Sequence, residues 1–109
     1  SKKTLASSPS ESSIQSKLIK QYRAAGYYVI KLGVTNKGGL PDLMLIKDGI
    51  ASFVEVKKAG CHPTPLQLHR ADELRAIGCV VRFVTEGDRD IEGVKTGDRA
   101  LAAEWRGES

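Results

Sequence analysis

The chain has 109 residues, which is enough for one hydrophobic core but not for two. With 40% hydrophobic and 28% charged residues it has the composition of an ordinary soluble globular protein, and a net charge of +4 permits a nucleic-acid partner. No apolar stretch approaches the roughly 20 residues of a membrane span. Two cysteines are too few for a disulfide scaffold, and the polar first residues do not resemble a signal peptide, so we expect a reducing cytoplasmic setting.

The first half of the chain predicts a flexible arm, a helix and a strand. Residues 1–10 are polar and rich in serine. Ser10 is a typical helix N-cap, and Gly26 ends the apolar pattern, which predicts an amphipathic helix over residues 11–25. The apolar positions at helical spacing are Ile14, Leu18, Tyr22 and Ala25. The β-rich run over residues 27–32 predicts a strand, followed by a glycine-rich loop.

Two apolar runs then flank an Asp-Gly pair, the strongest short-range signal for a β-hairpin. The predicted strands are residues 42–46 and 51–57, joined around Asp48 and Gly49. Because a two-residue turn sets the register, Met44 is expected opposite Phe53, and Asp42 opposite Glu55.

The second half predicts a helix, a strand and a short final helix. Thr64 is a typical N-cap with proline after it, and the apolar positions that follow are Leu66, Ala71, Leu74 and Ile77, with His69 on the same helix. Residues 79–84 read as a buried strand that follows a crossover connection, which favours a partly parallel, mixed sheet. Residues 85–97 are expected to form a loop, and residues 98–105 a last helix with Trp105.

The predicted hairpin places two carboxylates and a lysine at the ends of apolar strands, where burying a charge is energetically unfavourable. Asp42 and Glu55 are expected directly opposite each other, with Cβ atoms roughly 4.5–5.5 Å apart, and like charges so placed destabilise a sheet. Lys57 points to the same face as Glu55. Two neighbouring carboxylates either share a proton or bind a cation, and their oxygens suit Mg²⁺ or Mn²⁺. The alternative is a solvated sheet end, where Lys57 pairs loosely with Glu55 and Asp42 caps the loop.

The sequence GLPDLMLIKDGIASFVEVKK, residues 39–58, resembles the PD-(D/E)XK nuclease signature. It is most similar to the VRR-NUC group (virus-type replication-repair nuclease), in which a G-x-P-D-L element precedes E-x-K and then a proline closely followed by glutamine. The matching elements are Gly39-Leu40-Pro41-Asp42-Leu43, Glu55-Val56-Lys57 and Pro65-Leu66-Gln67. The resemblance covers residues 11–84, and the tail after residue 85 has no counterpart.

The resemblance implies an α/β fold with a restriction-endonuclease-like core, a mixed β-sheet flanked by helices. It implies that Asp42, Glu55 and the backbone carbonyl of Val56 bind one or two Mg²⁺ or Mn²⁺ ions, and that Lys57 orients or activates water. Gln67 matches the family glutamine near the site. Glu11 matches an acidic residue on the first helix, although a first-turn acid is also favoured by the helix dipole alone.

The expected activity is a metal-dependent DNA endonuclease. The resemblance implies a homodimer acting on branched DNA, like Holliday-junction resolvases, in a bacterial or phage-infected cell. Lys37 and Lys58 flank the predicted site and are the best candidates for contacts to DNA phosphates, whereas His62 and His69 are expected to have packing or surface roles. We expect residues 11–84 to form the nuclease core and residues 85–109 to extend the same domain.

Three alternatives stay open at this stage. The first is a sequence-specific restriction or nicking nuclease, which would need base-reading loops. The second is a catalytically silent DNA-binding module, in which the acids have no role. The third is an accessory domain that binds other proteins.

Overall fold

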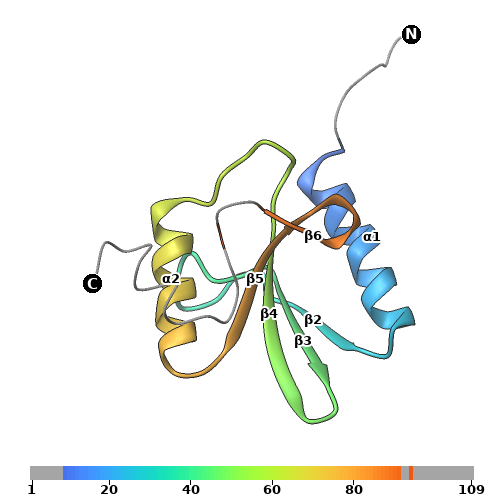
Figure 1. Cartoon of the computed structure of the whole chain (residues 1–109), viewed down its shortest axis with the longest axis horizontal. Helices are drawn as coiled ribbons and strands as arrows, with labels where there is room; N and C mark the ends of the chain where they lie inside the picture. The colour runs from blue at the N-terminus through green and yellow to red at the C-terminus, as the bar shows by residue number, and fades with distance from the viewer. Residues whose placement is uncertain (1–8, 92–93, 95–109) are drawn as a thin grey trace, which may run out of the picture.

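The computed structural model describes residues 9–91 and residue 94 of the chain. One five-stranded sheet, with strand order β2-β3-β4-β5-β6, has one α-helix on each face (Figure 1). The elements are α1 (Glu11–Ala24), β2 (Tyr28–Lys31), β3 (Leu43–Lys47), β4 (Ile50–Val56), α2 (Pro65–Ala76), β5 (Val80–Thr85), the 3₁₀ turn η1 (Glu86–Asp88) and β6 (Arg89–Asp90). The predicted α/β fold with a mixed sheet is therefore confirmed.

The sheet is antiparallel from β2 to β4, and β5 then joins it parallel to β4. The turn between β3 and β4 holds Asp48 at φ 53° and Gly49 at φ 78°. Two consecutive positive φ angles are what a tight two-residue hairpin requires, because this turn matches the twist of its strands. The observed pairs include Met44 with Phe53, so the predicted register is confirmed.

Both helices begin where the capping residues predicted. The amide of Ser13 donates to Ser10 Oγ at 3.1 Å before α1. Ahead of α2, Thr64 and Gln67 form a reciprocal capping box, in which the Gln67 amide donates to the Thr64 hydroxyl and the Thr64 amide donates to Gln67 Oε1. These bonds satisfy amide groups that a helix N-terminus leaves without partners.

The predicted buried face is correct for α1 and partly correct for α2, where Ala71 is buried and Leu74 packs against the core. Ile14, Leu18 and Tyr22 are buried as expected, while Ala25 is exposed at the C-cap. On α2, Leu66 is 46% exposed and Ile77 is 77% exposed. The residues buried there are Ala71, Asp72 and Arg75. The guanidinium of Arg75 donates to the carbonyl of Val81 at 2.7 Å and lies over the Phe83 ring, so a cation is buried at a position outside the predicted apolar pattern.

The hydrophobic core is divided by the sheet into two layers. Side chains alternate between the two faces along each strand, so successive residues of a strand pack in different layers. The layer with α1 contains Ile14, Leu18, Tyr22, Leu43, Leu45, Val54, Val56 and Val84. The layer with α2 contains Ala71, Val81, Phe83 and Val94.

The chain after β5 differs from the predicted loop. The 3₁₀ turn η1 follows Thr85, and Arg89 and Asp90 then pair antiparallel with β5 as the short strand β6. Local sequence gave no alternating apolar pattern for β6, because both of its residues are charged and exposed. Residues 1–8 of the expected arm over residues 1–10, and the expected helix over residues 98–105, lie outside the described residues.

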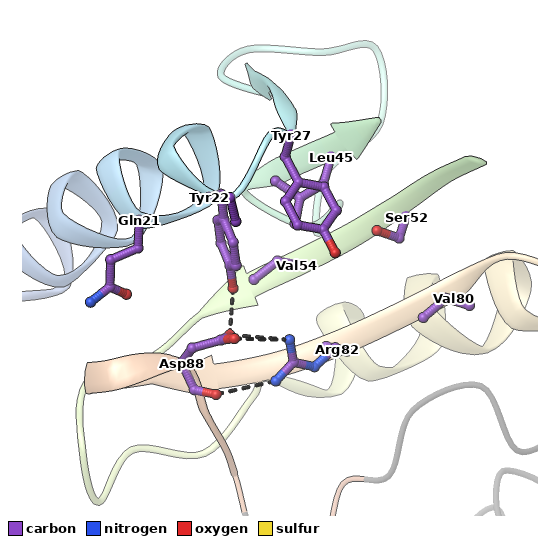
Figure 2. A pocket seen from close by; sticks show the side chains of 10 residues that line it. Gln21, Tyr22, Tyr27, Leu45, Ser52, Val54, Val80, Arg82 and Asp88 are labelled. Carbon is purple, nitrogen blue, oxygen red and sulfur yellow. Dashed lines mark hydrogen bonds and ion pairs between the residues drawn. The ribbon is translucent and has the colours of Figure 1, made fainter. Parts of the chain in front are cut away.

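A polar link joins α1 to the turn after β5. The hydroxyl of Tyr22 donates to the carboxylate of Asp88, which also accepts from Arg82 at 3.1 Å (Figure 2). Arg82 reaches the Asp90 carboxylate as well, at 2.8 Å. Tyr22, Arg82 and Asp88 line a cavity of about 370 Å³ between the C-terminal end of α1 and the sheet. None of the described helices is long and apolar enough to cross a membrane.

Candidate active site

Asp42 is held from two directions just before β3. Extending the β3–β4 register by one pair places it opposite Glu55, since Leu43 pairs with Val54. Its backbone carbonyl accepts the amide of Leu32 at 2.7 Å, and its Oδ2 accepts the amide of Val56 at 2.9 Å. The carboxylate is therefore positioned by two neighbouring strands, and its orientation does not depend on side-chain packing alone.

Glu55 is a buried acid with few partners. Its residue is 3% exposed. Oε2 accepts a hydrogen bond from Gln67 Nε2 at 3.1 Å and lies 3.7 Å from Lys57 Nζ. Oε1 is buried without a hydrogen-bond partner among the described residues. A solvated sheet end is excluded by this geometry, because the acid is removed from water and one of its oxygens has nothing to bind.

The electrostatics of the two acids follow from burial and proximity. Burial, and then the charge of Asp42, raise the pKa of Glu55 to about 8, although Lys57 opposes the shift. Burial also raises the pKa of Asp42, whereas the amide of Val56 favours its ionised form. Because Asp42 has this amide and Glu55 is more deeply buried, a proton shared by the pair belongs mainly to Glu55.

Lys57 and Val56 complete the cluster at the end of β4. Lys57 is only 8% exposed, so its ammonium group is held close to Glu55 in a largely dry environment. The amide of Val56 points toward Asp42. In an extended strand the amide and carbonyl of one residue point to the same neighbouring strand, so the Val56 carbonyl faces the Asp42 side as well.

Glu11 faces this cluster from the first turn of α1. Its side chain is exposed, but its charge contributes to the raised pKa values of both Asp42 and Glu55. The structure therefore brings Glu11 within electrostatic reach of the two acids. Among the described residues, no three acidic, histidine or cysteine side chains gather closely enough to hold a metal ion.

The cluster nevertheless fits a hard divalent cation. Two carboxylates and a backbone carbonyl are oxygen donors of the kind that Mg²⁺ binds, and Mg²⁺ usually keeps several waters as its remaining ligands. The unpartnered Oε1 of Glu55 is the structural observation that favours this fit, because a buried carboxylate oxygen without a donor is costly unless something binds it.

The loop that carries Asp42 is fastened to the start of α2. Gly39 has φ +79°, and a Cβ on it would lie 2.6 Å from Leu66 Cγ. Arg70 Nε donates to the carbonyl of Gly38 at 2.9 Å. Glycine is required here because the backbone is left-handed and the helix approaches it closely. Arg70 was not among the predicted site residues, and no local pattern could reveal its contact with a loop 32 positions earlier.

The two lysines expected to contact DNA lie in different loops, Lys37 between β2 and β3 and Lys58 after β4. Lys37 is exposed near α2, where it lowers the pKa of Glu73 to a lesser degree than the hydrogen bond from Arg70 does. Lys58 is half-buried directly after Lys57. His69 Nε2 lies 3.3 Å from a carboxylate oxygen of Glu73 at the surface, in line with the expected surface role.

Comparisons with known proteins give the family. No family model matches the chain. The chain is 36% identical over 69 residues to "Putative nuclease p44" of Acyrthosiphon pisum secondary endosymbiont phage 1, covering 62% of this chain and 74% of that protein. It also superposes on a solved structure described as a VRR_NUC domain, with a TM-score of 0.63 and 32% identity, covering 72% of this chain and 86% of the solved one. The aligned fold and the shared sequence together show that the chain belongs to the VRR-NUC nuclease family.

Proposed function

We propose that the protein is an endonuclease that hydrolyses phosphodiester bonds in DNA at the cluster of Asp42, Glu55, Lys57 and Gln67, with Mg²⁺ or Mn²⁺ as its cofactor. The observation that carries the proposal is Glu55, a buried carboxylate beside a second acid and a buried lysine, with one oxygen unpartnered. The nuclease name of the phage relative supports the same class of reaction.

Asp42, Glu55 and the Val56 carbonyl would hold the metal. A divalent cation bound there would supply charge stabilisation at the phosphate and lower the pKa of a bound water. Asp42 is held in place by the amide of Val56, and Glu55 by the amide group of Gln67. Such support keeps ligands in a binding geometry before the cation arrives, which is how second-layer contacts increase metal affinity.

Lys57 supplies the nearest positive side chain to the acids. Its ammonium group can donate a hydrogen bond to a phosphate oxygen or to the attacking water, and its low exposure makes such a bond stronger than it would be in bulk water. Glu11 adds negative charge within electrostatic reach of both acids, so it would favour cation binding.

We further propose that the substrate is branched DNA and that the active form is a homodimer. The described part of the chain carries one cluster of this kind, and cutting two strands symmetrically requires two such sites related by a two-fold axis. No base-reading module such as a zinc finger or a helix-turn-helix occurs in the described residues, which favours recognition of DNA shape over recognition of sequence. Lys37 and Lys58 would contact the phosphate backbone.

The test is cleavage of three labelled substrates: a four-way junction, a linear duplex of matching sequence and a splayed arm. Each is incubated with Mg²⁺, Mn²⁺ or EDTA, for the wild type and for Glu55→Ala. We expect paired nicks in the junction with either metal, none in EDTA and none with the variant.

Other outcomes separate the parts of the proposal. Equal cleavage of every substrate keeps the nuclease and rejects the preference for branched DNA. Cleavage that persists in EDTA rejects the metal. Tight junction binding without cleavage, unchanged by Glu55→Ala, identifies the silent DNA-binding module instead. Sedimentation of the protein at working concentration tests the dimer independently.

A further inference from the structure

A groove of about 330 Å³ lies at the end of the sheet where β4 and β5 finish. It is formed by the loop after β4, the last residue of β5 and the short strand β6. Its lining includes Lys58, His62, Thr85, Arg89 and Ile91. In α/β sheets, ligands bind in crevices outside the carboxyl ends of parallel strands, and β4 and β5 are the parallel pair of this sheet.

Thr85 connects the groove to the candidate active site. Val56 pairs with Val84, and the amide of Lys57 donates to the Val84 carbonyl at 2.8 Å, so Lys57 and Thr85 are the next neighbours along the ladder. Glu55 pairs with Phe83 on the same ladder. Because side chains alternate along a strand, Thr85 lies on the face that also carries Glu55 and Lys57.

The hydroxyl of Thr85 forms no hydrogen bond within the described part of the chain. Its Oγ1 is buried and has no hydrogen-bond partner among the described residues. A buried hydroxyl without a partner destabilises a fold by about 1–3 kcal/mol, so such a group requires an explanation. Thr85 lines the groove, but its Oγ1 is turned away from solvent, so a rotation about χ1 is needed to present the hydroxyl to a ligand there.

The charge of the groove favours an anion. Lys58 and Arg89 bring two positive charges, and His62 brings further donor capacity. The acid in the lining is Asp90, whose carboxylate is already engaged by Arg82 at 2.8 Å and 3.0 Å. The apolar surface of Ile91 lies in the same groove. Cationic groups next to an apolar wall suit a nucleotide, with its phosphate on the cations and its sugar on the wall.

We infer that this groove is the subsite for a nucleotide next to the bond that is cut. Lys58 and Arg89 bind the phosphate of that nucleotide, and the Thr85 hydroxyl donates a hydrogen bond to it after rotation about χ1. The subsite positions the DNA strand across Lys57 and Glu55. This inference rests on the proposed function, because it assigns a place to one part of the proposed substrate.

The first test compares steady-state cleavage by Lys58→Gln, Arg89→Gln and Thr85→Val with cleavage by Lys20→Gln. Lys20 is exposed on α1 and serves as the matched loss of one positive charge. Lys58→Gln and Arg89→Gln should each raise KM about 10-fold, and Thr85→Val about 3-fold. The effect of Thr85→Val is smaller because hydrogen bonds from charged donors to phosphate are stronger than those from a hydroxyl. The kcat of these groove variants should stay at the wild-type value, and Lys20→Gln should change neither constant.

Thr85→Val also separates a binding role from a structural one. Valine keeps the shape of the side chain and removes the unpartnered hydroxyl, so the melting temperature should stay the same or rise. A variant that is at least as stable as the wild type and binds DNA more weakly supports the subsite. Loss of stability together with loss of DNA binding would mean that the hydroxyl has a structural role, and would overturn the assignment of Thr85.

The second test does not need catalysis. The dinucleotide pTpT is titrated into the wild-type protein in EDTA, and the backbone amide signals are followed by NMR. Shifts concentrated at residues 58–62, 85 and 89–91, absent with Lys58→Gln, support the subsite even if the wild type cuts no DNA. If the wild type cleaves DNA while the groove variants match Lys20→Gln and pTpT shifts none of these signals, the subsite is rejected and the proposed function stands.

Discussion

Glu55 shows how one residue can lower stability and still be useful. Its carboxyl is buried beside Asp42, and its pKa is raised to about 8. In the unfolded chain the same group titrates near its ordinary value of 4.5. The folded metal-free protein therefore holds this proton more tightly than the unfolded chain does, and ionisation of Glu55 opposes folding. A cation at Asp42 and Glu55 would relieve this opposition.

The pH dependence of stability follows from that shift. In EDTA, the free energy of unfolding of the wild type should fall as pH rises from about 5 to about 9, since a raised folded-state pKa gives stability that is lost on deprotonation. Glu55→Gln should flatten the fall and be more stable than the wild type by about 1–3 kcal/mol at the high end. Denaturant titrations at several pH values measure this. Glu86→Gln, outside the site, controls for the loss of a carboxylate. If the free energy of unfolding has the same pH dependence in the wild type and in Glu55→Gln, the burial argument is contradicted.

Gln67 has two contacts that mutation can separate. Its Oε1 caps α2 through the Thr64 amide, and its Nε2 donates to Glu55. Thr64→Ala and Gln67→Ala should each lose about 1 kcal/mol of stability, because each removes part of the capping box. Gln67→Ala alone should also lower kcat by about 10-fold, as expected when a metal ligand loses its supporting partner. Equal kcat values for the two variants would show that Gln67 only caps the helix.

At the scale of the elements, the loop between β2 and β3 is the part that places Asp42. Gly39 lies against Leu66 at the start of α2, and Arg70 on that helix holds the carbonyl of Gly38. The N-terminal turn of α2 therefore serves both acids, because the same turn carries Gln67 to Glu55.

Gly39→Ala should disturb this loop and lower both stability and activity. Alanine at φ +79° is strained, and its Cβ would meet Leu66, so we expect a loss of about 1–3 kcal/mol. Gly33→Ala is the matched control, because no atom lies within 4 Å of a Cβ there. Thermal unfolding and cleavage assays measure both effects. Adding Leu66→Ala should recover part of the loss by making room for the methyl group, and no recovery would assign the whole effect to backbone strain.

At the scale of the whole molecule, one hydrogen bond links α1 to the turn after β5. Tyr22 on α1 donates to Asp88 after β5, a contact across 66 positions of the chain (Figure 2). Burial, and then the hydrogen bond to Asp88, raise the pKa of the Tyr22 phenol above its ordinary value. The phenol therefore stays protonated and keeps donating over the physiological pH range.

Tyr22→Phe should weaken the fold without changing the chemistry. Removing the hydroxyl deletes one hydrogen bond to a carboxylate that Arg82 still holds, so we expect a loss of about 1–2 kcal/mol. Tyr28→Phe is the control, since Tyr28 is 69% exposed on the edge strand. The kcat of Tyr22→Phe should match the wild type at temperatures where both are folded. A fall in kcat would mean that this link also positions the acids.

Local sequence was sufficient where a few neighbouring residues decide the backbone. The Asp48-Gly49 turn adopts the positive φ angles of a tight hairpin, and that register alone places Asp42 opposite Glu55. Ser10 and Thr64 start the two helices through hydrogen bonds that span three residues. Periodicity predicted the buried face of α1 as well.

Only the tertiary structure decided how deeply each charged group is buried and which distant group it contacts. The depth of Glu55, the cation of Arg75 inside the α2 layer and the strand β6 depend on packing between segments far apart in the chain. The same holds for Thr85, which belongs to an ordinary strand by sequence and lines a cationic groove in the fold. Short hydrogen-bonded turns and caps are encoded by local backbone preferences, whereas desolvation and long-range pairing arise only when the whole chain is folded.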